Sequence, residues 1–323
     1  MDKERSAGMA AVVVGATAFG FLGLFSRYFM DAGLNALDTV VIRISIALLI
    51  LTPIMLLSGL DSLRISRKDI PIFLVFGFFK LMSDITYFYA QSSVTLCLAT
   101  LLQMTAPFYV MFVSFVIFRE KITIKKMVSL TLTIAGCIMV TGALTGGASA
   151  EISGVLSALV SGLFFGMFMI GGRITFLRNI KPETGLFYTF LVAAVFALPF
   201  SDMGGIATAI IDYEGLFNAL MLGGAMTLLP FYLYNWSVQY LEPTTSTMIS
   251  VLEVVVAAAV GFSFFGERLG ILNFMGMMLV IVSILVMNIT IRIGYRKKYG
   301  KYVPPARKAN ESKDVTPATK EVS

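Results

Sequence analysis

The sequence of 323 residues contains no histidine and only two cysteines, Cys97 and Cys137. Histidine is the commonest general base and metal ligand, so its absence disfavours most enzyme and metal-site interpretations. Two cysteines in apolar stretches cannot supply a disulfide scaffold or a Cys/His metal site. We therefore predict no catalytic residue, no metal and no cofactor in this chain.

Charged residues are also scarce, at 14% of the chain, whereas 57% of the residues are apolar. Soluble domains carry about 25% charged residues, and disordered chains are poor in apolar ones. The composition excludes both classes and predicts an all-α, multi-pass integral membrane protein, which we expect in the plasma membrane.

Ten apolar runs are close to the length of about 20 residues that a helix needs to cross the hydrocarbon of a bilayer. They cover residues 7–29, 37–58, 70–90, 94–118, 126–144, 152–174, 184–200, 215–237, 244–265 and 271–291. Beyond them, residues 292–323 hold nine Lys/Arg and a Pro-Pro pair, which predicts a disordered basic cytoplasmic tail.

The basic residues predict the orientation of the ten spans. With the N-terminus in the cytoplasm, 21 of the 25 Lys/Arg fall in cytoplasmic segments, and only Arg27 and Arg268 fall outside. Basic residues favour the cytoplasmic side of membrane proteins. We therefore predict that both termini are cytoplasmic. The net charge of +6 reports this topology, and we expect no nucleic-acid partner.

The two halves of the sequence resemble each other at a shift of about 147 residues. The matched pairs include Tyr87 with Tyr234, Gln103 with Ser250, Glu120 with Glu267 and, at a shift of 146, Phe19 with Phe165. Five spans in each half force the second copy to enter the membrane from the opposite side. We predict inverted repeats over residues 1–147 and 148–291, a common plan of secondary transporters, although a channel or a membrane enzyme could also arise by duplication.

Several short motifs lie within or at the ends of the predicted helices in both halves. They are Phe19-Gly20, Arg43, Thr105-Ala106-Pro107 and Arg119-Glu120-Lys121 in the first half, and Leu252-Glu253 and Gly266-Glu267-Arg268 in the second. In these motifs residues 8–290 resemble the EamA-type permeases of the drug/metabolite transporter superfamily. That family often has Trp-Gly and Glu-Pro where this chain has Phe19-Gly20 and Glu253-Val254. The resemblance implies a ten-helix carrier of small metabolites, often an exporter, with a cavity lined mainly by helices 1, 3, 4, 6, 8 and 9.

Lys80 and Asp84 are ionisable residues near the middle of the third span. Their i, i+4 spacing puts them on one helix face, where they can form an ion pair, and Tyr87 continues that face. The positions we matched to them in the second half are apolar or Pro230. The pair is either a structural ion pair or a substrate or proton site, and an amino acid, with its ammonium and carboxylate, would suit it.

Glu253 and Arg43 are the other two ionisable residues inside the spans. Glu253 could exchange a proton during transport, or it could cap backbone groups or pair with Arg43 or Lys80. Because the resemblance includes a glutamate here, it favours a structural or coupling role. Arg43 lies in the outer third of its span, where snorkelling to the interface favours a structural role.

Five further residues are candidates for lining a cavity. They are Tyr87, Phe19 and Phe165, with Gln103 and its repeat partner Ser250 as the polar members. The buried amide of Gln103 needs hydrogen-bond partners. By contrast, Tyr234 and Trp236 fit the belt of aromatic residues at the membrane interface.

Two prolines and two glutamates have predicted mechanical roles. Pro107 and Pro230 remove backbone hydrogen bonds and are expected to bend their helices beside the cavity. Glu120 and Glu267 lie at span ends on opposite membrane faces, where they form either closing gates or solvated salt bridges of little energetic value.

Together these features predict a secondary active transporter of a small polar or amphipathic metabolite, with amino acid export as one form. Its partners are the substrate, the bilayer and a proton or another coupling ion, since the sequence lacks a nucleotide-binding loop of the G-x-x-x-x-G-K-[ST] kind. The alternatives are an importer or exchanger of a nucleotide sugar or organic amine and, from other classes, an intramembrane enzyme or a passive channel.

Overall fold

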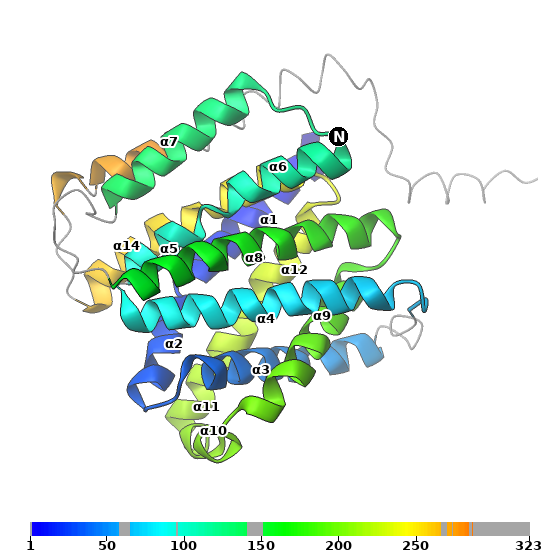
Figure 1. The fold of residues 1–323 in the computed structure, drawn as a ribbon, viewed down its shortest axis with the longest axis vertical. Coiled ribbons are helices and arrows are strands. Elements are labelled where there is room, and N and C mark those ends of the chain that lie inside the picture. Colours follow the sequence, from blue (N-terminus) through cyan, green and yellow to red (C-terminus); the bar gives the residue numbers. More distant parts are fainter. Residues whose placement is uncertain are drawn as a thin grey trace, which may run out of the picture.

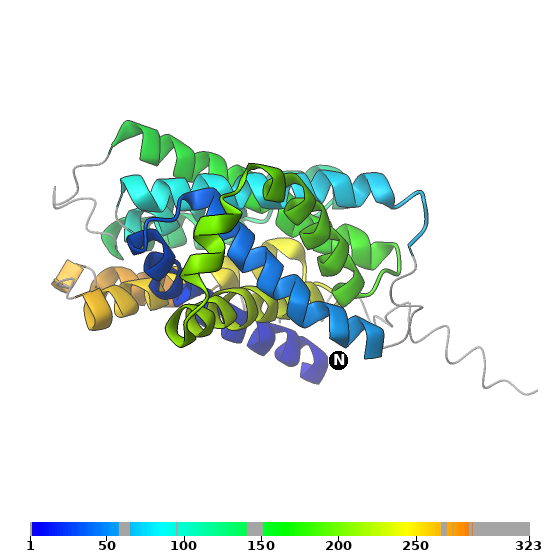
Figure 2. The ribbon, with the colours of Figure 1, turned by 90° about the horizontal axis from the view of Figure 1, so that it is seen from below.

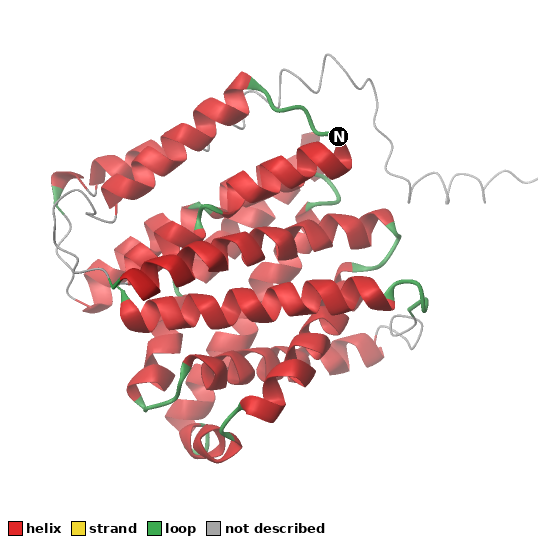
Figure 3. Cartoon of the chain, viewed as in Figure 1, coloured by secondary structure: helices red, strands yellow, loops and turns green. Residues whose placement is uncertain are grey.

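The computed structural model describes residues 2–57, 65–94, 96–140, 151–265, 270–272, 274–283 and 286, and the regular elements in these ranges are helices (Figure 3). In the first half they are α1 (Asp2–Gly20), α2 (Leu22–Asp31), α3 (Ala36–Leu57), α4 (Ile70–Ser93), α5 (Leu96–Gln103), α6 (Ala106–Phe118) and α7 (Ile124–Val140). The second half begins with α8 (Ile152–Leu177), α9 (Pro182–Ala197), η3 (Leu198–Phe200), α10 (Met203–Ala209) and α11 (Tyr213–Leu220). It continues with η4 (Met221–Leu228), which is a π-helix, α12 (Leu229–Ser237), α13 (Pro243–Ser250) and α14 (Leu252–Phe265).

Eight helical segments in the described ranges are long and apolar enough to cross a membrane. They are 4–31, 36–57, 70–93, 99–118, 152–177, 182–200, 213–237 and 243–264. Where we expected a fifth span, α7 has 17 residues. Where we expected a tenth, the apolar helix at 274–283 is shorter still, and much of 271–291 lies outside the described residues. The all-helical membrane architecture is therefore confirmed, while ten crossings and the orientation of the termini stay predictions.

Helices from the two halves of the chain pack on one another throughout the bundle (Figure 1). Helix α4 of the first half packs against α8 and α9 of the second, and α1 of the first half packs against α12 and α14 of the second. Figure 2 shows α1 on one side of the molecule and α4 on the other. Large apolar side chains such as Leu49 and Phe112 point outward, as expected of surfaces that face lipid. The space between the two groups of helices is filled by buried side chains of both halves.

Three of the spans contain a break between two helices. The first span breaks at Phe21, the fourth at 104–105 just before Pro107, and the ninth at Val251. The breaks at 104 and 251 are 147 residues apart, so they fall at matched positions of the two halves. Pro230 is the second residue of α12, which begins directly after the π-helix η4. Breaks in spans leave backbone groups without helical partners, which is tolerated only inside the protein or beside a cavity.

The same side-chain contact also recurs at matched positions. The Tyr87 hydroxyl lies 2.8 Å from the Thr100 hydroxyl, and Tyr234 lies 3.1 Å from Thr247 in the same way. Both pairs join the helix before a break to the first part of the broken span. Each half of the chain thus builds the same local structure.

Candidate functional site

Arg43, Lys80 and Asp84 form a buried ionic cluster at the centre of the bundle. Arg43 Nη1 lies 3.0 Å from Asp84 Oδ1, and Lys80 Nζ contacts Asp84 Oδ2. The side chains of Arg43, Lys80 and Asp84 are 4%, 0% and 6% exposed. The expected contact between Lys80 and Asp84 forms, and two cations share one carboxylate. Within the described ranges, no three Cys, Asp or Glu side chains gather in a group that could hold a metal ion.

Arg43 does not extend to the membrane interface, so the expectation that it snorkels is wrong. Its guanidinium turns inward, where Nη1 donates to Asp84 and Nε donates to Thr227 Oγ1 at 2.6 Å. Thr227 lies in the π-helix η4, whose spacing brings the Leu222 carbonyl, five residues earlier, within reach of the Thr227 hydroxyl that donates to it. Gly223 permits this approach of η4 to α3, since an added Cβ would lie 2.5 Å from the Ile46 side chain.

Aromatic rings surround the two cations. Lys80 Nζ lies 4.9, 5.5 and 5.8 Å from the ring centroids of Phe231, Phe190 and Phe168. Arg43 Cζ lies 5.7 Å from the rings of Phe88 and Phe231. A cation close to a ring face is attracted by the ring's quadrupole, and the attraction grows when water is excluded. The rings therefore offset part of the cost of burying the charges.

Phe231 is the residue around which this centre is packed, and the sequence alone did not single it out. The candidate cavity residues Phe19 and Phe165 pack on it, with centroid distances of 4.8 and 6.4 Å, and both are buried. At a shift of 147 residues, Phe231 matches Asp84, and Thr227 matches Lys80. At the shift of 146 residues that holds earlier in each half, the counterparts of Lys80 and Asp84 are the apolar Met226 and Pro230, as expected. At 147 residues the counterpart of Lys80 is the polar Thr227, whose hydroxyl accepts from Arg43 Nε.

Glu253 is a second buried acid near the cluster. It is the second residue of α14, next to the break at Val251, and it is 5% exposed. Its carboxylate interacts electrostatically with Arg43 and Tyr87, but none of the described residues forms a hydrogen bond or ion pair with it. The direct pairing with Arg43 or Lys80 that we considered is therefore wrong. A carboxylate in the first turn of a helix is favoured by the helix dipole.

The polar candidates Gln103 and Ser250 lie at the ends of the two helices that precede the matched breaks. Gln103 Nε2 donates to Ser161 Oγ at 2.9 Å, so the expected partner of the buried amide is a residue of α8. The Ser250 hydroxyl donates to the Ser246 carbonyl within its own helix at 3.0 Å. Tyr234 is buried and bonds Thr247, so its assignment to the interfacial belt is wrong.

A third ionic group lies at the end of the bundle that holds the loops after α6 and α12. Lys126 Nζ lies 3.0 Å from both Glu120 Oε2 and Glu242 Oε2, and Thr244 Oγ1 donates to Glu120 Oε2 at 2.7 Å. Glu120 follows Arg119, whose left-handed φ of 53° ends α6. Burial raises the pKa of the Glu120 carboxyl, and Lys126 offsets part of that rise. This group joins the two halves, whereas Glu267, its expected counterpart, lies outside the described residues.

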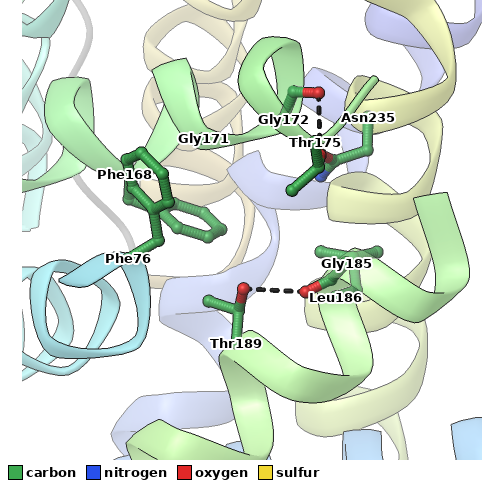
Figure 4. Close-up of a pocket in the computed structure, with 9 residues that line it drawn as sticks. All are labelled: Phe76, Phe168, Gly171, Gly172, Thr175, Gly185, Leu186, Thr189 and Asn235. Carbon is green, nitrogen blue, oxygen red and sulfur yellow. Dashed lines mark hydrogen bonds between the residues drawn. The ribbon is translucent and has the colours of Figure 1, made fainter. Parts of the chain in front are cut away.

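A small pocket lies between α4, α8, α9 and α12 (Figure 4). It is lined by Phe76, Phe168, Gly171, Gly172, Thr175, Gly185, Leu186, Thr189 and Asn235. Thr175 and Thr189 donate their hydroxyl protons to the carbonyls of Gly172 and Gly185, at 3.0 and 2.7 Å. Phe168 lines this pocket, and its ring centroid lies 5.8 Å from Lys80 Nζ, so one side chain borders both the pocket and the cluster.

Comparison with known proteins decides the family. The model of the EamA-like transporter family matches the chain twice, over residues 6–142 and 152–289. The chain belongs to the EamA-like transporter family. This confirms the resemblance found in the sequence motifs. It makes the protein a multi-pass transporter of the cell membrane and not an enzyme.

Relatives extend over most of the chain. An uncharacterized transporter of Archaeoglobus fulgidus is 24% identical over 279 residues, which cover 86% of this chain and 95% of the relative. The uncharacterized transporter YxxF of Bacillus subtilis is 21% identical over 282 residues, which cover 86% of this chain and 88% of the relative. A solved crystal structure shares the fold at a TM-score of 0.69 and 14% identity, covering 89% of this chain and 98% of that one.

Proposed function

We propose that this transporter is a secondary active carrier that works by alternating access between two inverted five-helix repeats, residues 1–147 and 148–291. The family model matches each half separately, and matched breaks and matched Tyr–Thr pairs recur at a shift of 147 residues. Secondary transporters commonly place a substrate site between such repeats, at discontinuous helices near the midplane. In this proposal the chain crosses ten times, both termini are cytoplasmic, and a proton or another ion supplies the energy.

The substrate site is the buried cluster of Arg43, Lys80 and Asp84. This cluster is the observation that carries the proposal, because α3 and α4 of the first half supply its charges and Thr227 and Phe231 of the second half complete it. Ionisable residues inside membrane helices are costly and mark substrate or ion pathways. Charges surrounded by phenylalanine rings suit a small amphipathic metabolite, and we propose an amino acid with an apolar side chain, which the protein exports.

Access to the site is controlled at the end of the bundle that holds Glu120. Lys126 and Glu120 of the first half bond Glu242 and Thr244 of the second, so they hold the two halves together at that end, which we assign to the cytoplasmic face. The pocket beside Phe168 is the path from this face toward Lys80. Separation of the two halves must break these bonds before that end can open.

Counterflow into proteoliposomes tests the proposal. Liposomes that hold purified protein are loaded with an unlabelled solute, and uptake of the labelled solute is followed against a trace concentration outside. A panel of apolar amino acids, organic amines and nucleotide sugars is first ranked by the rise in melting temperature that each produces, since a ligand stabilises the state it binds. Saturable counterflow of an amino acid supports the proposal, whereas single-channel currents in a planar bilayer, or counterflow of an amine or nucleotide sugar alone, contradict it.

A further inference from the structure

Both carboxylate oxygens of Asp84 already hold a cation. Oδ1 accepts from Arg43 and Oδ2 contacts Lys80. A third cation at this carboxylate would stand beside two others in a site that excludes water, where like charges repel strongly. The ammonium group of a substrate therefore gains little at Asp84. The cluster has one positive charge in excess, so it favours an additional anionic group.

Glu253 offers the carboxylate that Asp84 does not. It is buried at the break between α13 and α14, and none of the described residues bonds its oxygens. The Arg43 guanidinium contacts Asp84 and also interacts electrostatically with Glu253, so the charge of Arg43 acts on both acids. A buried carboxylate without a hydrogen-bonding partner is costly, and a donor group that reaches it recovers that cost.

We propose that Glu253 receives the ammonium group of the substrate, that Arg43 and Lys80 receive its carboxylate, and that Asp84 remains as their internal counter-ion. This inference rests on the proposed transport of an amino acid. If the Lys80–Asp84 pair alone bound the amino acid, Asp84 would bind its ammonium group. In the present assignment Glu253 binds the ammonium group instead. With the zwitterion bound, three cationic and three anionic groups balance. The apolar side chain lies against the rings of Phe19, Phe165 and Phe231, which pack together beside the cluster.

Three compounds with the same apolar body separate the two ends of the substrate. L-phenylalanine has both charged groups, 3-phenylpropionate has only the carboxylate, and phenethylamine has only the ammonium. Their dissociation constants are measured by calorimetry on the full-length purified protein. A hydrogen bond to a charged group contributes about 1.5–3 kcal/mol, so wild-type protein is expected to bind L-phenylalanine roughly 10- to 100-fold more tightly than 3-phenylpropionate.

The decisive variant is Glu253→Gln, with Glu214→Gln on the exposed surface of α11 as the matched control. Glu253→Gln is expected to bind L-phenylalanine no more tightly than 3-phenylpropionate, while its affinity for 3-phenylpropionate stays at the wild-type value. Glu253→Asp keeps the charge and is expected to retain most of the preference. Glu214→Gln is expected to match wild type for all three compounds.

Two results would overturn the assignment. In the first, Glu253→Gln keeps the wild-type preference for L-phenylalanine and changes only the pH dependence of transport, which makes it a coupling residue. In the second, Asp84→Asn removes the binding of phenethylamine while Glu253→Gln does not, which places the ammonium at Asp84. If wild-type protein binds none of the three compounds yet shows saturable counterflow of another amino acid, this inference fails and the transport proposal stands. If no tested solute shows counterflow, the transport proposal fails as well.

Discussion

Substitutions in the Arg43–Asp84–Lys80 cluster are expected to separate the stability of the protein from its function. Asp84→Asn removes the carboxylate that, among the described residues, contacts both cations, whose side chains are 4% and 0% exposed. Breaking a buried ion pair by removing one partner costs about 3–5 kcal/mol. Lys80→Met instead leaves the Arg43–Asp84 pair, at 3.0 Å, and puts an apolar side chain of similar length among phenylalanine rings. Such a replacement is expected to change the free energy of unfolding by less than about 1 kcal/mol.

These free energies correspond to melting temperatures that can be measured in detergent. At about 2 °C per kcal/mol for a protein of this size, Asp84→Asn is expected to melt roughly 6–10 °C below wild type, and Lys80→Met within roughly 2 °C of it. Fluorescence-detected size-exclusion chromatography after heating gives both values from small samples. The reasoning is refuted if Lys80→Met is as destabilising as Asp84→Asn. That result would mean that Asp84 needs both cations, and that Arg43 alone does not satisfy its carboxylate.

Three smaller changes test other parts of the structure. Burial raises the pKa of Glu120 above its usual value, so its ionised form is disfavoured in the folded state. The melting temperature of wild type should therefore fall relative to that of Glu120→Gln as the pH rises from about 4.5 through the raised pKa. A constant difference between the two melting temperatures would contradict this. Tyr87→Phe and Tyr234→Phe each remove one hydrogen bond of the matched pairs, so each should cost about 0.5–1.5 kcal/mol by thermal melting, and a large inequality would count against equivalent local structures. In the pocket, an added Cβ at Gly172 would lie 2.3 Å from a side-chain oxygen, whereas at Gly185 it would meet atoms no closer than 3.5 Å. Gly172→Ala should therefore lower the melting temperature, while Gly185→Ala should not. Equal effects of the two substitutions would show that the pocket is not shaped as described.

Most of the helices could be predicted from the sequence, because the hydrocarbon thickness dictates the length of an apolar run. The contact between Lys80 and Asp84 was also predictable, since both lie on one helix and i, i+4 spacing alone brings them together. The break beside Pro107 could be anticipated from the missing backbone hydrogen bond. The matched break at Val251 is followed by a helix without proline, so only the repeat could have indicated it.

The partners that come from other helices could not be predicted. The position of Arg43 near a span end suggested snorkelling, but the direction of its side chain depends on Asp84 and Thr227 in other helices. Thr227 reaches Arg43 from a π-helix, whose spacing an ordinary helical periodicity does not reveal. Phe231 is one of 27 phenylalanines, and composition does not distinguish a ring over a buried cation from a ring in lipid. A repeat alignment at 147 residues, which pairs Phe231 with Asp84, was the one available signal.

The central claim is that the buried cluster of Arg43, Lys80 and Asp84 binds the transported substrate. Its most direct test is counterflow of labelled L-phenylalanine into proteoliposomes that hold equal amounts of folded wild-type protein, Lys80→Met or Asp84→Asn. Saturable uptake by wild type, with uptake by Lys80→Met reduced to the level of empty liposomes although its melting temperature is nearly unchanged, is the predicted result. Uptake at the wild-type rate by both folded variants would contradict the claim and leave the cluster as a structural ion pair.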